Sequence, residues 1–257
     1  MIQIKSDREL DRMREAGRHV GEILLILREQ ARPGTTTSEL DEIAHQEIYD
    51  RELGSSFLDY APGGAPPYPG VICASINEEI VHGIPGPREL SEGDLLKIDF
   101  GVTFEGFHGD SAVAIQVGDP DPEVQRLQDV TRDSLYAGVK EMLPGNRLGD
   151  VSSAVQDVIE SNGFAVVRDF VGHGIGRLLH EAPQVPNFGR AGRGPRLRAG
   201  MVIAIEPMVN CGSAGVMMKE DGWTAVTADS ALSCHYEHTV AITDRGPEVL
   251  TQVSGSH

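Results

Sequence analysis

The sequence is short of basic residues, cysteine and long apolar runs, and each shortage excludes a class of protein. Lys and Arg number 22 against 39 Asp and Glu, which gives a formal net charge of −17. Nucleic acids and anionic membranes are polyanions, so an acidic surface argues against broad binding to either. Cys73, Cys211 and Cys234 have no CxxC spacing and make neither a disulfide framework nor a thiolate zinc site. The longest aliphatic run, residues 23–27, is far too short to span a bilayer.

The composition is that of an ordinary globular chain. The 257 residues are 40% hydrophobic and 24% charged, which is enough to bury a large core. Residues 1–5 lack the basic and then apolar layout of a signal peptide, and no linker composition interrupts the chain. We therefore expect a single domain over residues 1–257, located in the cytoplasm, with no membrane or DNA partner.

Helix signals come in two pairs. A capping-box pattern at residues 6–9 opens a helix, Pro33-Gly34 ends it, and a second such pattern at 36–39 opens the next helix. Pro144-Gly145 repeats the turn 111 residues later (144 minus 33). This repeat predicts two similar α+β halves whose strands join in one sheet. The helices predicted around the second turn lie at about 122–142 and 149–161.

Strands are predicted where short apolar runs stand between turn signals. A proline- and glycine-rich stretch at 62–70 is expected to be an irregular loop, and no strand is predicted within a glycine-rich stretch at 172–200. The fold class expected is α/β, with helices and a mainly antiparallel sheet. The predicted strands are 71–76, 95–100, 112–117, 201–205, about 224–227, 237–243 and 248–252.

Two aspartates stand in neighbouring predicted strands. Asp99 lies between apolar residues, where a lone carboxylate is costly to ionise. A two-residue turn at Glu105-Gly106 places Asp99 opposite Ala112, and Asp110 then points to the same face on the diagonal. Two converging carboxylates repel each other unless a cation or a proton lies between them. Taken alone, the two residues leave two interpretations open: a metal site, or a surface Asp110 near the turn together with an Asp99 that accepts backbone hydrogen bonds.

Two glutamates stand at the ends of other apolar strands. Glu206 follows the apolar run 201–205 and precedes Pro207, which cannot donate to a β-ladder and so ends the strand. Glu237 opens the predicted strand 237–243. Either residue alone fits a solvated strand end. Four carboxylates at such positions of one sheet are harder to attribute to solvation.

Histidines could add nitrogen ligands. His173 lies between glycines in a Gly-His-Gly tripeptide, which lets the backbone approach a ligand closely. His180 follows seven residues later, and His82, taken alone, fits a structural role better. Carboxylates with imidazole suit Mn, Fe, Co or Zn. Four carboxylates exceed the charge of one divalent ion and match two ions about 3.5–4 Å apart, which lower the pKa of a shared water.

Six segments together resemble type I methionine aminopeptidases, in the order of that family and from about residue 4 to 252. The resemblance implies a pita-bread fold with pseudo-twofold halves and the activity of a monomeric dinuclear metallo-aminopeptidase. It also implies removal of the initiator methionine of nascent polypeptides, with a preference for a small second residue. The segments are SINEEIVHGIP (75–85), LLKIDFGVTFEGFHGDSA (95–112), GHGIGRLLHEAPQVPNF (172–188), MVIAIEPMV (201–209), KEDGWT (219–224) and YEHTVAIT (236–243).

The resemblance also implies a role for each candidate residue. Glu206 would accept and shuttle a proton, His180 would donate to the carbonyl oxygen, and His82 would contact the scissile amide. Two divalent ions (Co, Mn, Fe or Zn) would be bound, Asp99 being bidentate to one ion while Asp110 and Glu237 bridge. The implied metal ligands are Asp99, Asp110, His173, Glu206 and Glu237, and the implied substrate-binding residues are Tyr68, Cys73, His82, His180 and Trp223.

Two segments depart from what the resemblance explains. The stretch 61–67 is longer than is usual in the family, and it borders the expected pocket beside Tyr60. Arginines cluster at Arg190, Arg193, Arg196 and Arg198, with no acidic residue between 189 and 200. A solvated loop is the favoured interpretation of this cluster, and contact with ribosomal RNA is the alternative.

Three other functions remain as alternatives. An X-Pro peptidase shares this catalytic half but usually carries a large amino-terminal domain, for which the position of Asp99 leaves no room. A catalytically dead binding protein would have lost metal ligands, whereas all five are present. A two-metal phosphoesterase is disfavoured by the acidic surface and by the lack of a phosphate-binding basic motif.

Overall fold

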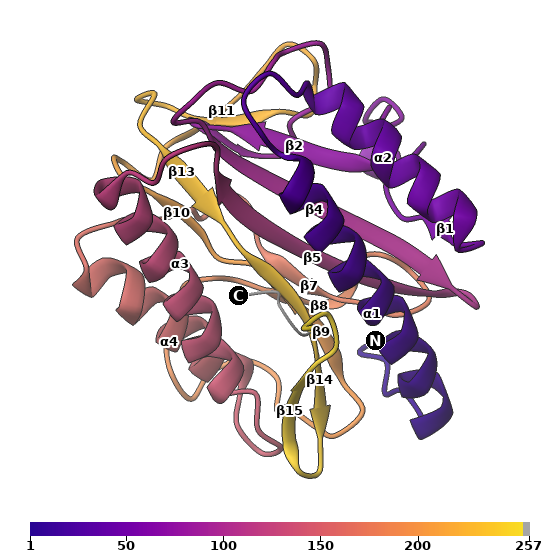
Figure 1. The fold of residues 1–257 in the computed structure, drawn as a ribbon. Helices are drawn as coiled ribbons and strands as arrows, with labels where there is room; N and C mark the ends of the chain where they lie inside the picture. The colour runs from indigo at the N-terminus through magenta and orange to yellow at the C-terminus, as the bar shows by residue number, and fades with distance from the viewer. Residues whose placement is uncertain (254–257) are drawn as a thin grey trace.

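Four α-helices lie along the chain in the two pairs that the sequence predicts (Figure 1). The computed structural model describes residues 1–253, so the last four residues of the predicted 1–257 domain lie outside the described residues. The two pairs are separated by the first long β-hairpin. The helices are α1 (Asp7–Gln30), α2 (Thr37–Asp50), α3 (Pro122–Lys140) and α4 (Leu148–Ser161), and one short 3-10 turn, η1, spans Pro62–Gly64.

The first two helices begin where the capping patterns predict. Ser6 and Glu9 form a capping box, in which the Ser6 backbone N–H donates to Glu9 Oε2 at 3.0 Å. Thr36 and Glu39 form the same arrangement before α2. These bonds satisfy backbone groups that a helix start leaves unpaired. Both helices turn apolar faces to the sheet, and the face of α1 packs with strands β2 (Ile72–Ile76), β4 (Leu95–Phe104) and β5 (Phe107–Gln116).

The predicted repeat between the halves is visible in the second helix of each pair. Both α2 and α4 have 14 residues, and their starts and ends are each offset by 111 (148 minus 37, 161 minus 50). Isolated β-bridges at Thr36 and at Arg147 precede them at the same offset. Gly34 and Gly145 both adopt positive φ values, 91° and 98°, which a glycine accepts without strain.

One large sheet joins the two halves. Its strands run in the order β1-β4-β5-β14-β9-β7-β8, with β2 also paired to β4 and β15 to β14. Every pairing recorded between the described strands is antiparallel, as predicted. The strands of this sheet are β1 (Gly54–Ser55), β2 (Ile72–Ile76), β4 (Leu95–Phe104), β5 (Phe107–Gln116), β7 (Gly172–Gly174), β8 (Glu181–Val185), β9 (Val202–Ile205), β14 (Glu237–Thr243) and β15 (Gly246–Val249).

The last strand differs from its prediction. A strand was expected at 248–252, but β15 spans Gly246–Val249, because residues 244 and 245 form a tight turn that pairs Thr243 with Gly246. Two small sheets were not predicted from the sequence, although one of their strands, at about 224–227, was. They are β13-β10-β6 and β11-β12-β3, built from β3 (Glu79–Val81), β6 (Ala165–Val166), β10 (Met208–Asn210), β11 (Val216–Met218), β12 (Ala225–Thr227) and β13 (Ser233–His235).

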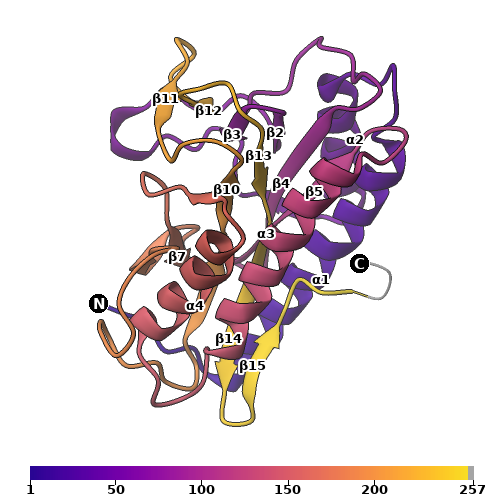
Figure 2. The same cartoon turned by 90° about the vertical axis from the view of Figure 1, so that its left-hand side faces the viewer.

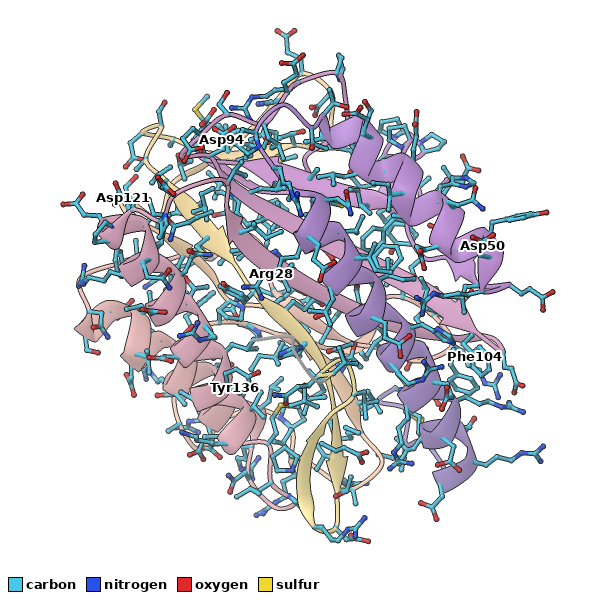
Figure 3. All side chains as sticks on the ribbon, viewed as in Figure 1. Arg28, Asp50, Asp94, Phe104, Asp121 and Tyr136 are labelled. Carbon is cyan, nitrogen blue, oxygen red and sulfur yellow. The ribbon has the colours of Figure 1, made fainter. Side chains whose placement is uncertain are left out.

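The helices α1 and α3 lie on the same face of the large sheet, with β5 and β14 behind them (Figures 1 and 2). Arg28 at the end of α1 and Tyr136 on α3 lie on this helical side (Figure 3) and line a cavity of about 450 Å³ there. No helix within residues 1–253 is both long enough and apolar enough to cross a membrane.

Candidate metal centre and substrate pocket

The β4–β5 hairpin brings the two aspartates together as the turn predicts. Phe104 pairs with Phe107 across the two-residue turn, so Asp99 lies opposite Ala112. Asp110 lies opposite Gly101 and therefore projects from the same face as Asp99. The close packing around Gly101, whose added Cβ would lie 3.0 Å from Asp110 Oδ1, leaves no space for a larger side chain.

Three other strands bring the remaining candidates to the same place. Glu237 also pairs with Ala112, from β14, so it adjoins Asp99 on the other side of β5. His173 on β7 pairs with Ala204 on β9, and Glu206 follows the end of β9. His173 Nε2 lies 3.6 Å from Glu206 Oε1 and 3.9 Å from Asp110 Oδ2. These separations are too long for hydrogen bonds.

The cluster has the donor atoms that a hard or borderline cation needs. Ligand atoms of Asp110, His173 and Glu237 lie within 4.8 Å of one another. Buried oxygens of Asp99, Asp110 and Glu237 have no hydrogen-bond partner among the described residues. Buried polar atoms are normally paired, so three unpaired carboxylate oxygens facing one space fit a bound cation.

The electrostatics of the cluster point the same way. Burial raises the pKa of Asp99 to about 7. Burial, followed by repulsion from neighbouring carboxylates, raises the pKa values of Asp110, Glu206 and Glu237 well above their usual range. Burial lowers the pKa of His173 to about 3, so its ring is neutral. Its Nδ1–H donates to the Gly174 carbonyl oxygen at 3.0 Å, which leaves the Nε2 lone pair for a ligand bond.

The glycines beside His173 have a different role from the one predicted. They were expected to let the backbone approach a ligand, but neighbouring backbone occupies the space instead. A Cβ on Gly172 would lie 2.4 Å from the Ala204 carbonyl oxygen, and one on Gly174 would lie 2.3 Å from the Ala182 carbonyl oxygen. Both glycines therefore allow close packing of neighbouring strands, which fixes the position of His173 between them.

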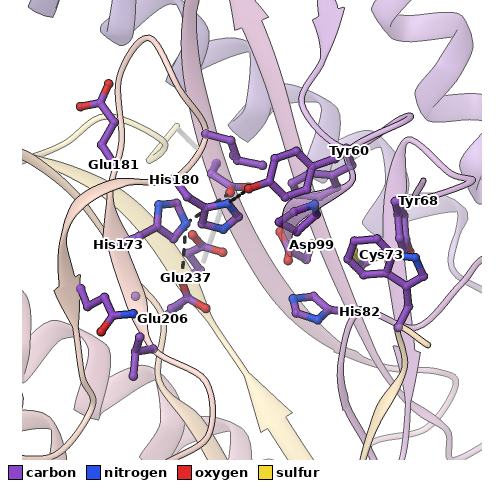
Figure 4. Close-up of a pocket in the computed structure, with 18 of the residues that line it drawn as sticks. Tyr60, Tyr68, Cys73, His82, Asp99, His173, His180, Glu181, Glu206 and Glu237 are labelled. Carbon is purple, nitrogen blue, oxygen red and sulfur yellow. Dashed lines mark hydrogen bonds and ion pairs between the residues drawn. The ribbon is translucent and has the colours of Figure 1, made fainter. Parts of the chain in front are cut away.

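All ten candidate residues line one cavity of about 580 Å³ (Figure 4). His173, Glu206 and Glu237 lie on one side of the cavity, Tyr68 and Cys73 lie on the other side, and Asp99 lies between the two groups (Figure 4). His82 adopts a positive φ of 60° directly after β3, and this unusual conformation carries its ring toward the cavity. Burial lowers the pKa of His82 to about 4, so this ring is neutral near pH 7.

The apolar end of the cavity is built from aromatic rings in fixed contacts. The Tyr68 and Trp223 rings meet edge to face, with centroids 5.1 Å apart. The single hydrogen of the Tyr68 hydroxyl is shared between the carbonyl oxygens of Ile72 and Gly83, which lie 3.0 and 2.8 Å from the hydroxyl oxygen. Trp223 Nε1 donates to the Pro66 carbonyl oxygen at 3.0 Å. Burial raises the pKa of Cys73, so the thiol stays protonated. Rings and a neutral thiol form an apolar, polarisable pocket.

The cavity also contains residues that the sequence analysis left without a role. Tyr60 lines it, and its hydroxyl bonds to His180 Nδ1. Glu181 lines it too, and it accepts a hydrogen bond from Lys5 Nζ at 2.7 Å, with both side chains largely buried. Neither contact has a signal in the sequence, because the partners are 120 and 176 residues apart.

The predicted arginine cluster lies away from the cavity, on a loop fastened to the start of α4. Backbone N–H groups of Leu148 and Gly149 donate to the carbonyl oxygens of Pro195 and Arg193. Arg196 Nη1 donates to the Gly145 carbonyl oxygen at 3.2 Å. The loop is therefore anchored by its backbone. Its exposed arginines are Arg190, Arg193, Arg196 and Arg198.

Comparison with known proteins identifies the class to which this fold and cluster belong. The pattern of metallopeptidase family M24 matches residues 11–244, which is most of the chain. The protein belongs to this metallopeptidase family, and its members' dependence on divalent metal ions agrees with the carboxylate cluster.

Within the family, its close relatives are methionine aminopeptidases. The chain is 51% identical over 253 residues to the methionine aminopeptidase of Clostridium perfringens. The alignment covers 98% of this chain and 100% of that relative. It is 47% identical to methionine aminopeptidase 1 of Bacillus subtilis, with 98% and 100% covered. The crystal structure of the Rickettsia prowazekii methionine aminopeptidase superposes with a TM-score of 0.94 at 38% identity, with 98% and 100% covered. The resemblance to type I methionine aminopeptidases and the predicted pita-bread fold are thereby confirmed.

Proposed function

We propose that this protein is an aminopeptidase that removes the initiator methionine from nascent polypeptides, with a preference for a small second residue. One observation carries the proposal: a cluster of four carboxylates and an imidazole shares one cavity with an apolar pocket of aromatic rings and a thiol. The cluster suits hydrolysis, and the pocket suits a thioether side chain. The names of its relatives agree with this activity.

The residues proposed to hold two divalent cations are Asp99, Asp110, His173, Glu206 and Glu237. When bound, such a pair lowers the pKa of the attacking water and polarises the scissile carbonyl group. The mixed oxygen and nitrogen ligands suit Mn, Fe, Co or Zn, and do not select one among them.

The other proposed steps belong to the side chains around the cluster. Glu206 accepts the proton of the attacking water, which its cavity-facing position supports. His180 donates a hydrogen bond to the carbonyl oxygen as that atom gains negative charge. His82, neutral because burial lowers its pKa, contacts the scissile amide. Tyr68, Cys73 and Trp223 enclose the methionine side chain.

The proposed setting is a monomer in the cytoplasm, acting on chains as they leave the ribosome. The anchored arginine loop supports contact with ribosomal RNA, because it presents four exposed cations on a chain of net charge −17. Such a contact is local, and its affinity would fall as salt concentration rises.

Peptide cleavage tests the proposed function directly. Protein purified without added cations is supplied with Mn²⁺, Fe²⁺, Co²⁺ or Zn²⁺ and assayed on Met-Gly-Gly, Met-Leu-Gly and Ala-Pro-Gly. We expect release of methionine from Met-Gly-Gly, little from Met-Leu-Gly, and no cleavage of Ala-Pro-Gly. Preferential cleavage of Ala-Pro-Gly would favour an X-Pro peptidase, and no cleavage with any ion would refute the proposal.

Substitution of Asp99 connects that activity to the cluster. Asp99→Ala removes a buried cluster carboxylate, so we expect loss of methionine release and of most bound metal, with an unchanged circular dichroism spectrum. Asp157→Ala, on the exposed face of α4, is the matched control and should keep both. Full activity in the Asp99 variant would contradict the proposed mechanism.

A further inference from the structure

A hydrogen bond joins two distant loops at the wall of the cavity. The Tyr60 hydroxyl bonds to Nδ1 of His180, which lies 120 residues further along the chain. Tyr60 follows β1 in the first half of the molecule, whereas His180 precedes β8 in the second half. Both side chains line the cavity of the carboxylate cluster, and Figure 4 shows the bond between them.

Tyr60 is held so that its hydroxyl reaches this nitrogen. Its backbone N–H donates to the Phe57 carbonyl oxygen, and its carbonyl oxygen accepts from the Tyr68 N–H, both at 2.9 Å. The Tyr60 ring lies with its centroid 5.3 Å from that of His180, tilted by 38°. These two backbone bonds fix the position from which the Tyr60 side chain extends toward His180.

His180 is held from the other side. The next residue, Glu181, accepts hydrogen bonds from the backbone N–H groups of Arg177 and Leu178 through Oε1, and from Lys5 Nζ through Oε2. These bonds close the loop that carries His180. The His180 ring also packs against the ring of His173, with centroids 4.2 Å apart. The imidazole orientation is therefore fixed by contacts on several sides.

The bond to Tyr60 favours one position for the proton of the His180 ring. A phenol has a single hydrogen, and a neutral imidazole has one donor and one acceptor nitrogen. Among residues 1–253, His180 Nδ1 is the recorded partner of the Tyr60 hydroxyl. A proton on Nδ1 would leave the hydroxyl hydrogen without a protein acceptor, whereas donation from Tyr60 to Nδ1 satisfies both groups. The ring proton is then on Nε2.

We propose that Tyr60 is a positioning residue that holds His180 in the Nε2–H tautomer, so that His180 offers a donor to the substrate carbonyl oxygen. The substrate carbonyl oxygen as the acceptor rests on the proposed function. The tautomer of His180 can be measured whether or not the protein is active. A histidine with its proton on Nδ1 would present a lone pair to an oxygen that gains negative charge, which would be repulsive.

Nitrogen NMR tests the tautomer without a catalytic assay. Full-length protein labelled with ¹⁵N-histidine is recorded by long-range ¹H–¹⁵N correlation, before and after addition of diamagnetic Zn²⁺, and His180 is assigned with the His180→Asn variant. We expect the Nε2–H pattern for His180 in the wild type. In Tyr60→Phe, which removes only the hydroxyl, the two nitrogen shifts should move toward each other as the tautomers mix. An Nδ1–H wild type, or an unchanged Tyr60→Phe spectrum, would overturn the proposal.

Kinetics separate positioning from substrate packing. On Met-Gly-Gly, Tyr60→Phe should lower kcat about 10-fold with little change in KM, less than the 100-fold or more that follows loss of an oxyanion donor itself. Tyr49→Phe, at an exposed tyrosine of α2, is the matched control and should match the wild type. A raised KM with unchanged kcat would overturn the positioning role. An inactive wild type with the Nε2–H spectrum would refute the proposed function and support the tautomer.

Discussion

At the scale of single residues, the main feature of the carboxylate cluster is that no basic side chain among the described residues balances the negative charge of its four acidic side chains. Asp99, Asp110, Glu206 and Glu237 converge in one buried space, and His173, the histidine among the proposed ligands, is neutral because burial lowers its pKa to about 3. Buried carboxylates without a counter-charge are costly to ionise. Protons or cations must therefore occupy the cluster, and the two compete for the same oxygens.

This competition predicts proton release on metal binding. Burial raises the pKa of Asp99 to about 7 and those of Asp110, Glu206 and Glu237 well above their usual range, so the metal-free cluster retains protons to a higher pH than exposed carboxylates do. Binding of Mn²⁺ at pH 7 should displace on the order of one proton or more per chain, and fewer as pH rises. Calorimetric titration in buffers of different ionisation enthalpy measures this number. Identical heats in all buffers would contradict the prediction.

Prediction from sequence succeeded at residues whose position follows from a short local rule. The register of Asp99 against Ala112 follows from a two-residue turn and the alternation of side chains in strands. Tyr60 illustrates the opposite case. Its hydroxyl meets His180 because two loops from different halves pack together, and no local pattern encodes that contact.

At the scale of secondary-structure elements, close packing of β7 fixes the position of His173. Gly172→Ala would place a Cβ 2.4 Å from the Ala204 carbonyl oxygen on β9, so the strands must separate. We expect a loss of about 1–3 kcal/mol in the free energy of unfolding, as for other overpacked sites, together with weaker Mn²⁺ binding. Urea unfolding and metal titration measure the two effects.

The control for this change is Gly86→Ala. Its added Cβ would have its nearest neighbour 4.0 Å away, so the strands and the free energy of unfolding should be little affected. Equal stability losses at the two glycines would show that strand packing at Gly172 is not the cause.

The pair of Lys5 and Glu181 anchors the loop of His180 to the amino-terminal segment. Their side chains are 5% and 7% exposed, and Nζ lies 2.7 Å from Oε2. Lys5→Met leaves a buried carboxylate without its counter-charge and should cost about 3–5 kcal/mol of unfolding free energy, much of which the double variant with Glu181→Met should recover. Breaking the exposed pair of Arg132 and Asp129 by Arg132→Met should cost about 1 kcal/mol or less. Equal costs for the two single variants, measured in urea, would disprove this role.

Helices were better predicted from the sequence than short strands. The capping boxes before α1 and α2 are local signals, and both helices begin there. In contrast, β7 and β8 lie in the glycine-rich stretch 172–200, where no strand is predicted from the sequence. Their pairing depends on Gly172 and Gly174 fitting between neighbouring strands, which is a tertiary effect that outweighs local propensity.

At the scale of the whole molecule, charge is unevenly distributed. The chain carries a net charge of −17, yet the loop anchored to α4 exposes Arg190, Arg193, Arg196 and Arg198. If this loop contacts ribosomal RNA, changing all four residues to Glu should abolish co-sedimentation with ribosomes at low salt and leave Met-Gly-Gly cleavage intact. Unchanged co-sedimentation would show that the loop is only a solvated surface loop and does not contact the ribosome.

Side chains from both halves of the sheet together are proposed to bind a pair of divalent cations. Anomalous diffraction from crystals soaked in Mn²⁺ would locate these ions. We expect two anomalous peaks in the cavity, in contact with side chains from β4, β5, β7 and β14 and with Glu206 after β9. Peaks found only at other surfaces, with the cluster oxygens unchanged after soaking, would contradict this proposal.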